Sequence, residues 1–274
     1  MIEGDRVKME DILLWEADTP DFCPEYGQPQ PTLTPYLCED QTAPRRGAVV
    51  IFPGGAYTHR SVHEGADIAK MFNAAGMHAF VLNYRLSPYL CKTILLDAQR
   101  AIRTVRARAD EFGVDPEKIA TIGFSAGGHL SMMAAEKFDY GREDGDGIDR
   151  TSCRPNASIL CYAVTDLESP EVDYFKVTCV GEDKKDDAAE AAKYSALPNI
   201  RKDMPPVFFW HTFTDTVVDV RHALSLASEM KANGLPFEMH VYPEGGHGLG
   251  LAPNNPVVAA WPADCCRWLH GLGF

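Results

Sequence analysis

From residue 47 onward, short β-branched runs alternate with amphipathic segments of helical length, and this alternation constrains the fold more than any other feature. The strand-like runs end in turn residues, as in "GAVVIFPGG", where Pro-Gly-Gly closes the run. The helix-like segments show apolar periodicity, as in "KTILLDAQRAIRTVRARADEFG", which Gly113 ends. Strands that are joined by helices of crossover length predict a mainly parallel sheet with helices on both faces.

The same pattern continues to the C-terminus, and no linker interrupts it. We therefore expect residues 1–274 to form one α/β domain. Residues 1–46 are rich in Pro, Asp and Glu and are predicted to form an arm or edge strands. Residues 167–205 are mixed and polar and are predicted to form a partial cover. Further strands are predicted in 78–86, 118–124, 157–166, 205–215 and 236–246, and helices in 61–76, 128–138, 220–234 and 257–274.

The charge and cysteine content exclude several classes of function. The net charge of −13 disfavours binding to nucleic acid or to an anionic membrane, because both need a positive surface. No window approaches 18 uncharged apolar residues, and the first 20 residues lack the apolar core of a secretion signal. The eight cysteines show no CxxC spacing. We therefore expect a cytoplasmic protein with reduced thiols.

A candidate nucleophile stands where a predicted strand meets a predicted helix. Gly123-Phe124-Ser125-Ala126-Gly127 fits the pattern G-x-S-x-G. In that pattern the serine occupies a sharp turn above the sheet, and small neighbours let the turn close. A glycine-rich helix start without chemistry is the alternative, but "KIATI" before the motif and "GHLSMMAAE" after it supply the strand and the helix that a nucleophile needs.

A serine needs a base, and the base needs an acid that orients it. Of the nine histidines, His247 in "YPEGGHGLGLA" lies in a glycine-rich loop after the last predicted strand. We expect Asp215, directly after the penultimate strand, to be the acid. Asp166 follows the preceding strand and is the rival, whereas Asp219 is expected to cap the next helix. His129 is expected to lie in the helix behind the nucleophile.

An ester hydrolase also needs donors for the negative oxygen of the tetrahedral intermediate. The turn Pro53-Gly54-Gly55-Ala56-Tyr57 follows the first strand of the alternating region, and its small residues leave backbone amides free. Together with the amide of Ala126, it predicts an oxyanion hole. A plain tight turn is the alternative.

Five stretches resemble the α/β-hydrolase superfamily, in order from about Gly47 to the C-terminus: "IFPGGAYTHRSVHEGADIAKMFNAAG", "FVLNYRLSP", "KIATIGFSAGGHL", "PPVFFWHTFTDTVV" and "YPEGGHGLGLA". More narrowly, they resemble the acetyl-esterase and acetylxylan-esterase-like branch, which is close to the hormone-sensitive-lipase-like enzymes. The resemblance implies an α/β-hydrolase fold, with a mainly parallel central sheet flanked by helices. It also implies a small cover in place of a large cap domain.

By this resemblance, the triad roles and the oxyanion roles fall on the residues already singled out: Ser125, Asp215 and His247, and Gly55, Ala56 and Ala126. The family motif His-Gly-Gly-Gly is here Pro-Gly-Gly-Ala. This departure leaves open which of Gly54, Gly55 and Ala56 donates. Arg85 is implied to be structural, with Asp97 as its partner. Tyr57 is expected to narrow the site or to stack on a sugar ring.

The expected function is a serine esterase that hydrolyses short acyl esters, acetyl above all, on O-acetylated sugars or xylo-oligosaccharides through an acyl-enzyme. The alternatives are a small peptidase of prolyl-oligopeptidase type and a non-catalytic binding protein on the same fold. We expect no cofactor and no metal, although His59 and His63 have the spacing of two metal ligands. The expected partner is a small-molecule or oligosaccharide ester. The oligomeric state stays open, with a homo-oligomer among the options.

Overall fold

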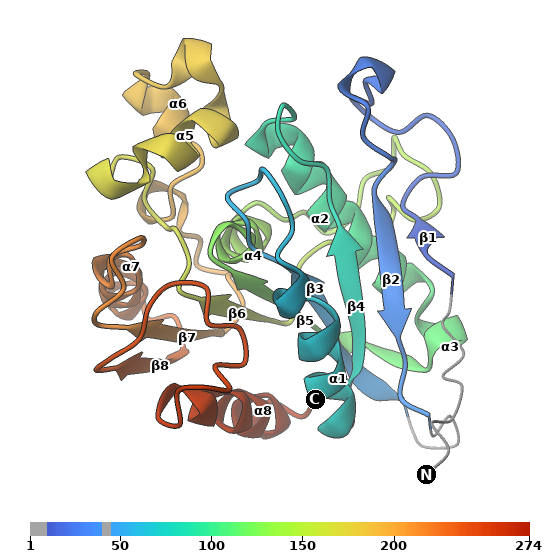
Figure 1. The fold of residues 1–274 in the computed structure, drawn as a ribbon. Coiled ribbons are helices and arrows are strands. Elements are labelled where there is room, and N and C mark those ends of the chain that lie inside the picture. The colour runs from blue at the N-terminus through green and yellow to red at the C-terminus, as the bar shows by residue number, and fades with distance from the viewer. Residues whose placement is uncertain (1–9, 40–44) are drawn as a thin grey trace.

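The computed structural model describes residues 10–39 and 45–274, and these build an eight-stranded sheet with helices on both faces (Figure 1). The strand order across the sheet is β1-β2-β4-β3-β5-β6-β7-β8. The strands are β1 Ile12–Leu13, β2 Thr32–Tyr36, β3 Arg46–Phe52, β4 His78–Asn83, β5 Val114–Phe124, β6 Ala157–Cys161, β7 Val207–Thr212 and β8 Phe237–Tyr242.

The sheet is parallel from β4 to β8, and only its N-terminal edge is antiparallel. β3 pairs in parallel with both β4 and β5, and β5, β6, β7 and β8 follow in parallel register. β2 runs antiparallel to β4 and to the short edge strand β1. The prediction of a mainly parallel sheet is therefore confirmed, and the carboxyl ends of β3 to β8 meet at one edge.

Side chains of successive strand residues point to opposite faces, and each face has its own apolar core. On β3, Val50 belongs to the core beneath α2, α4 and α7, whereas Val49 and Ile51 belong to the core beneath α1 and α8. None of the described helices is both long and apolar enough to cross a membrane. The helices are α1 Ala66–Ala74, α2 Cys91–Ala107, α3 Ala109–Phe112, α4 Ala126–Glu136, α5 Asp173–Val180, α6 Ala188–Ala192, α7 Arg221–Ala232 and α8 Trp261–Gly271.

The arm and the cover lie at the sheet's flanks. Of the predicted arm 1–46, residues 1–9 and 40–44 lie outside the described part, and the rest contributes the edge strands β1 and β2. The region 167–205 forms α5, α6 and three short 3₁₀ helices, and α5 and α6 stand together at one end of the sheet in Figure 1. The 3₁₀ helices are η1 Pro24–Tyr26, η2 Val62–Glu64, η3 Pro170–Val172, η4 Glu182–Lys184, η5 Leu197–Asn199 and η6 Val258–Ala260.

The cysteines depart from expectation at one pair. Cys91, at the start of α2, and Cys179, in α5, form a disulfide, so the expectation that all thiols are reduced is wrong for these two. The other six cysteines form no disulfide within the described residues. The packing of α5 against the start of α2 brings the two Cα atoms to 4.7 Å. The sequence hides this contact, because 88 residues separate the two cysteines.

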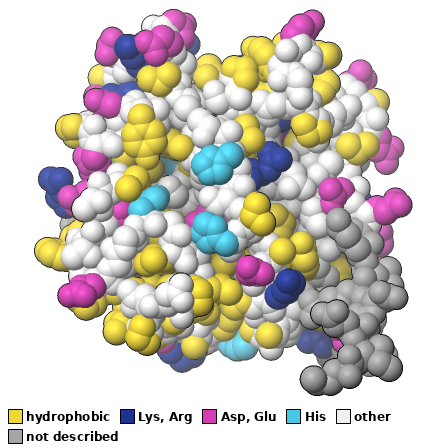
Figure 2. All heavy atoms as spheres, in the orientation of Figure 1, with side chains coloured by type: hydrophobic (Ala, Val, Ile, Leu, Met, Phe, Trp, Pro, Cys, Tyr) yellow, Lys and Arg dark blue, Asp and Glu magenta, His cyan; other side chains and the backbone are white. Residues whose placement is uncertain are grey.

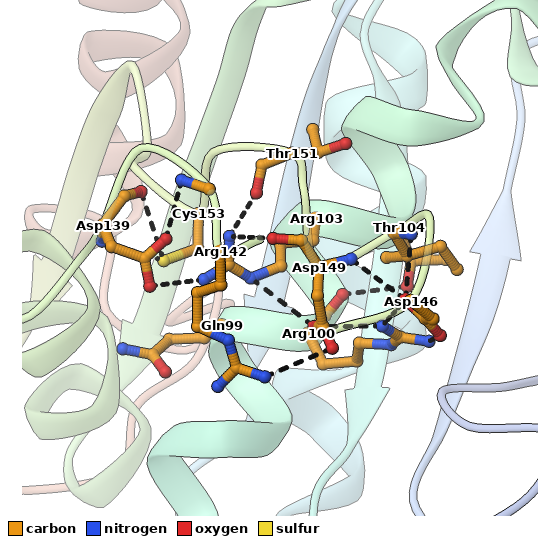
Figure 3. Close-up of polar contacts among 12 residues, drawn as sticks. Gln99, Arg100, Arg103, Thr104, Asp139, Arg142, Asp146, Asp149, Thr151 and Cys153 are labelled. Carbon is orange, nitrogen blue, oxygen red and sulfur yellow. Dashed lines mark hydrogen bonds and ion pairs between the residues drawn. The ribbon is translucent and has the colours of Figure 1, made fainter. Parts of the chain in front are cut away.

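Buried arginines of α2 anchor the polar loop between α4 and β6 (Figure 3). Arg100 makes two hydrogen bonds to the carboxylate of Asp146, at 2.7 and 2.5 Å. Arg103 donates to Asp139 at 2.5 Å and to the backbone oxygen of Thr151. Carboxylates of the loop neutralise the charges of both arginines, so these side chains stabilise the fold by attaching the loop to α2.

A second buried pair joins the segment after β4 to α2. Arg85 donates to Asp97 through Nη2 at 2.6 Å and through Nε at 3.1 Å, and both side chains are fully buried. Arg85 also donates through Nη1 to the backbone oxygen of Pro20 at 2.5 Å, which ties the N-terminal segment to the same point.

Candidate active site

Ser125 occupies a strained turn between β5 and α4, with φ of 53° and ψ of −116°. The glycines on either side are required by close packing. A Cβ atom on Gly123 would lie 1.8 Å from the oxygen of Gly127, and one on Gly127 would lie 1.9 Å from the oxygen of Phe52. Such a strained serine conformation persists only where the surrounding structure enforces it, so the G-x-S-x-G pattern has a steric cause here.

Ser125, His247 and Asp215 form one chain of hydrogen bonds. Ser125 Oγ lies 2.7 Å from His247 Nε2, and His247 Nδ1 lies 2.7 Å from Asp215 Oδ2. The three side chains come from the β5–α4 turn, the loop after β8 and the loop after β7. The two rival aspartates bond elsewhere. Asp166 accepts from the amide of Glu168, and Asp219 accepts from the amide of Arg221 at the start of α7.

The loops that carry the acid and the histidine are tied to each other. Thr212 and Thr214 both donate through Oγ1 to the backbone oxygen of Gly245, at 2.9 and 3.0 Å. The amide of Gly245 donates back to Thr214 Oγ1 at 2.9 Å. These bonds fix the loop after β8 against the loop after β7, so the distance between His247 and Asp215 does not depend on their own hydrogen bond alone.

Asp215 is almost fully buried and is held in its ionised form. Its Oδ1 accepts from the amides of Val217 and Val218 at 2.9 and 3.1 Å. Burial alone would raise the pKa of Asp215, but its interactions with His211 and His247 outweigh this and hold the pKa well below its usual range. His211 Nε2 lies 3.5 Å from Asp215 Oδ2 and donates to the oxygen of Val218. The sequence analysis missed His211, although its i, i+4 spacing from Asp215 was a signal.

The loop after β3 lies next to the serine and carries free amides. Gly55, Ala56 and Tyr57 all have positive φ, at 124°, 50° and 59°. Gly54 lies so close above the nucleophile that a Cβ atom on it would be 3.2 Å from Ser125 Cβ. In the described structure, no group accepts a hydrogen bond from the amides of Gly55, Ala56 or Ala126. These amides can therefore receive a ligand oxygen.

The amide of Gly54 is already engaged, because it donates to Glu64 Oε2 at 2.7 Å. Glu64 Oε1 accepts from the hydroxyl of Tyr162 at 2.6 Å, and the oxygen of that hydroxyl accepts from the amide of Gly250 at 3.0 Å. The buried Glu64 thus links the loop after β3 to the loop that carries His247. It braces the loop where the family motif has a histidine, and the sequence analysis did not single it out.

Of the two roles that the sequence suggested for Tyr57, stacking on a sugar ring is wrong. Its side chain is fully buried, so its ring cannot stack on a bound sugar. Its hydroxyl donates to His129 Nδ1 at 2.8 Å, and its ring lies 5.1 Å from that of Phe175 in α5. His129 donates through Nε2 to the oxygen of Tyr194. Burial lowers the pKa of His129 to about 4, which keeps it neutral in this network.

Histidine side chains gather at the centre of the face shown in Figure 2. His59 and His63 are exposed, and His63 Nε2 donates to the oxygen of Gly248 at 2.9 Å. Neither belongs to a group of three ligand-type side chains within the described ranges. The one such group is Cys91, His129 and Cys179, whose sulfurs are bonded to each other and whose ring nitrogens are both hydrogen-bonded.

The chain is similar to known proteins in both sequence and fold. The BD-FAE family model matches residues 34–230. The crystal structure of an acetyl ester-xyloside bifunctional hydrolase from Caldicellulosiruptor lactoaceticus superposes with a TM-score of 0.92 at 38% identity, and the match covers 99% of each chain. The fold of this chain is therefore that of the α/β hydrolases, as the sequence predicted.

Two curated proteins are similar over most of this chain. Endo-1,4-beta-xylanase B of Butyrivibrio fibrisolvens is 32% identical over 90% of this chain, and acetylxylan esterase of Xylanibacter ruminicola is 32% identical over 84% of it. The matches cover 39% and 46% of those two proteins. This chain thus spans less than half the length of the curated relatives that it matches.

Proposed function

The chain belongs to the BD-FAE family, and we propose that it is a serine esterase that removes short acyl groups, acetyl above all, from O-acylated sugars such as xylo-oligosaccharides. The observation that carries the proposal is the hydrogen-bonded chain Ser125–His247–Asp215, which begins on a strained turn beside free amides. The names of the similar proteins, which include an acetylxylan esterase and an acetyl ester-xyloside hydrolase, support the substrate class.

In the first half of the proposed reaction, His247 Nε2 takes the proton of Ser125 Oγ as that oxygen attacks the carbonyl carbon of the ester. The carbonyl oxygen becomes negative and receives hydrogen bonds from the amide of Ala126 and from those of Gly55 and Ala56. When the intermediate collapses, the bond to the sugar oxygen breaks. His247 gives its proton to that oxygen, and the acetyl group stays on Ser125.

In the second half, a water molecule takes the place of the sugar. His247 accepts a proton from this water, the hydroxide oxygen attacks the acyl carbon, and the same amides hold the new oxyanion. The bond to Ser125 Oγ then breaks, the serine recovers its proton from His247, and acetate leaves. Asp215 stays ionised throughout and stabilises the imidazolium form of His247. The chain itself supplies nucleophile, base and oxyanion donors, so we expect no cofactor.

Labelling and turnover of the Ser125→Ala protein test the proposal. A fluorophosphonate probe should label the wild type at Ser125, and the wild type should release acetate from acetylated xylotetraose. Ser125→Ala should abolish labelling and lower kcat by about 10⁶-fold. Ser61→Ala is the matched control, because Ser61 lies near the same loop and its hydroxyl makes no hydrogen bond within the described residues. Near-normal turnover by Ser125→Ala would sink the assignment.

The two alternatives from the sequence are less well supported. A binding protein has no need for a strained serine that is bonded to a histidine, and the names of the relatives favour esterases over peptidases. The cytoplasmic location stays a prediction. The Cys91–Cys179 bond argues against it, because disulfides persist in oxidising compartments.

A further inference from the structure

A pocket of about 640 Å³ lies beside the candidate active site, and none of Ser125, His247 and Asp215 lines it. Its walls come from the N-terminal segment 26–30, from residues 83–87 after β4, and from Thr58 and Arg60 after β3. In Figure 1 the segment with η1 stands at the same end of the sheet as the segment that follows β3. The volume falls within the range of about 300–1,000 Å³ that is typical of ligand sites.

The wall of this pocket and the loop with the free amides are one connected unit. Thr58 donates to the oxygen of Gly55 through both its amide and its hydroxyl, at 2.9 and 3.0 Å. Arg60 Nη1 donates to the oxygen of Tyr84 at 2.6 Å, and the hydroxyl of Tyr84 donates to the oxygen of Pro53. The pocket therefore borders the loop that carries the amides of Gly55 and Ala56.

The pocket is held open by a preformed frame. Gln28 donates through Nε2 to the oxygens of Leu86 and Ser87, at 2.8 and 3.0 Å, and its Oε1 accepts from the amide of Leu86. This side chain clamps the N-terminal segment to the residues after β4. A site that is already ordered loses little conformational entropy when a ligand binds.

The lining offers donors and acceptors that no described residue uses. These are Arg60 Nη2, Gln30 Nε2 and Asn83 Oδ1, and the hydrogen bonds of these three side chains to described residues are made through other atoms. The ring of Tyr26 is 45% exposed and packs edge-on against Tyr89, which leaves a face for a ligand. The exposed hydroxyl of Tyr26 adds one more polar group.

We propose that this pocket is a subsite for the sugar rings that carry the ester, with an unsubstituted xylo-oligosaccharide as its simplest ligand. The proposal rests on the proposed function. Sugar hydroxyls both donate and accept, as the mixed lining requires, and an aromatic face suits the apolar side of a ring. An acyl chain would instead remove these polar groups from water without partners, at a cost in free energy. The net charge of −13 also disfavours a polyanion as the ligand.

Binding without turnover gives the first test. In the Ser125→Ala background, xylotetraose is titrated into the protein by isothermal calorimetry. Tyr26→Ala and Arg60→Gln should each raise Kd by about 3- to 10-fold, which is the effect of one or two hydrogen bonds. Tyr140→Ala is the control, because Tyr140 is 64% exposed and follows α4 at the opposite end of the sheet. Equal Kd values for all four proteins, or tight binding of maltotetraose without xylotetraose, would overturn the xylan subsite.

Kinetics give the second test. The ratio of kcat/KM for acetylated xylotetraose to kcat/KM for p-nitrophenyl acetate should fall about 3- to 10-fold in Tyr26→Ala and in Arg60→Gln, mainly through KM. An unchanged ratio would contradict the subsite. The two proposals fail separately. Suppose that the wild type cannot remove acetyl groups from acetylated xylotetraose, but that Ser125→Ala binds unsubstituted xylotetraose and Tyr26→Ala weakens this binding. The proposed function then fails and the subsite stands. If the wild type does deacetylate acetylated xylotetraose but the ratio of kcat/KM values is unchanged in Tyr26→Ala and Arg60→Gln, the proposed function stands and the subsite fails.

Discussion

At the scale of single residues, the site depends on one buried carboxylate whose environment keeps it charged. Two amides and two histidines surround Asp215, and together they outweigh the effect of burial on its pKa. His211 takes no part in the proposed proton transfers. In the proposed mechanism, its contact with Asp215 keeps the carboxylate oriented, and the hydrogen bond between Asp215 and Nδ1 of His247 leaves Nε2 free to accept the proton of Ser125.

Replacing the carboxylate by an amide tests this account. In Asp215→Asn, the side chain keeps its shape but loses its charge and presents an NH₂ group or a weaker acceptor to His247. We expect kcat for p-nitrophenyl acetate to fall by about 10³- to 10⁴-fold, with a folded protein by circular dichroism. Asp219→Asn is the matched control, because Asp219 lies four residues on and, among the described residues, its side chain bonds only to Arg221. A larger loss in Asp219→Asn than in Asp215→Asn would mean that the acid has been misassigned.

The positions of these residues were predictable to different degrees. Ser125 and Asp215 stand at the carboxyl ends of predicted strands, and parallel strands bring such positions together whatever the rest of the chain does. Tyr57 was predicted wrongly, because nothing local indicates that α5 packs Phe175 onto its ring. The role of Glu64 could not be predicted either, since its partners Gly54 and Tyr162 lie 10 and 98 residues away in sequence.

At the scale of elements, the parallel strands were easy to predict and their connections less so. Strands that are buried on both faces are largely apolar, as in β7, where every residue is buried and the first four residues are apolar. The segment predicted as one helix over 61–76 is instead η2 followed by α1, which begins only at Ala66. Glu64 is the last residue of η2, and its buried carboxylate bonds to Gly54 and Tyr162. The interruption between η2 and α1 therefore coincides with the residue that links the two loops.

The hydrogen bonds of Glu64 predict that its replacement lowers kcat. Both oxygens of Glu64 accept from buried donors, and a glutamine offers only one acceptor, so Glu64→Gln leaves either Gly54 or Tyr162 without a partner. An unpaired buried donor costs about 1–3 kcal/mol. Because the loop carries the proposed oxyanion donors, we expect kcat to fall about 10- to 100-fold, with KM changed less than about 3-fold.

Two further variants distinguish a specific effect of Glu64 on the loop from a general loss of stability. Tyr162→Phe removes one hydroxyl and should reproduce part of the loss in kcat, and Asp67→Asn removes an exposed carboxylate from the neighbouring helix α1. All variants are compared by thermal unfolding as well as by kcat. If Glu64→Gln and Asp67→Asn have equal kcat values, Glu64 does not position the loop.

At the scale of the whole molecule, the cover is fastened directly behind the site. The Cys91–Cys179 bond joins α5 to the start of α2 across 88 residues of chain. Thr178 donates to the oxygen of Ala56 at 3.0 Å, and Phe175 packs on Tyr57. The cover, the loop with the free amides and the core beneath them therefore form one packed layer. The sequence indicated a cover in 167–205 but not this fastening, which depends on contacts between distant segments.

A fastened cover should limit the acyl group that the enzyme accepts. A long apolar channel would add about 0.8 kcal/mol per buried methylene, so kcat/KM would climb with chain length. Here α5 fills the space behind the amides of Gly55 and Ala56. We expect kcat/KM to fall from p-nitrophenyl acetate through butyrate to octanoate, by about 10-fold or more overall. A maximum at octanoate in the wild type would move the protein toward the lipases.

The same measurement in a protein without the disulfide tests the cause of the limit. In the double variant Cys91→Ala, Cys179→Ala, α5 keeps the contacts of Phe175 and Thr178 but loses its covalent tie, so the ratio of octanoate to acetate turnover should rise. Cys266→Ala, which removes a free and partly buried thiol, is the control. Thiol titration of the denatured wild type should find six free thiols before reduction and eight after it. A chain-length profile that is identical in the wild type and the double variant would show that packing alone, and not the disulfide, holds the cover over the site.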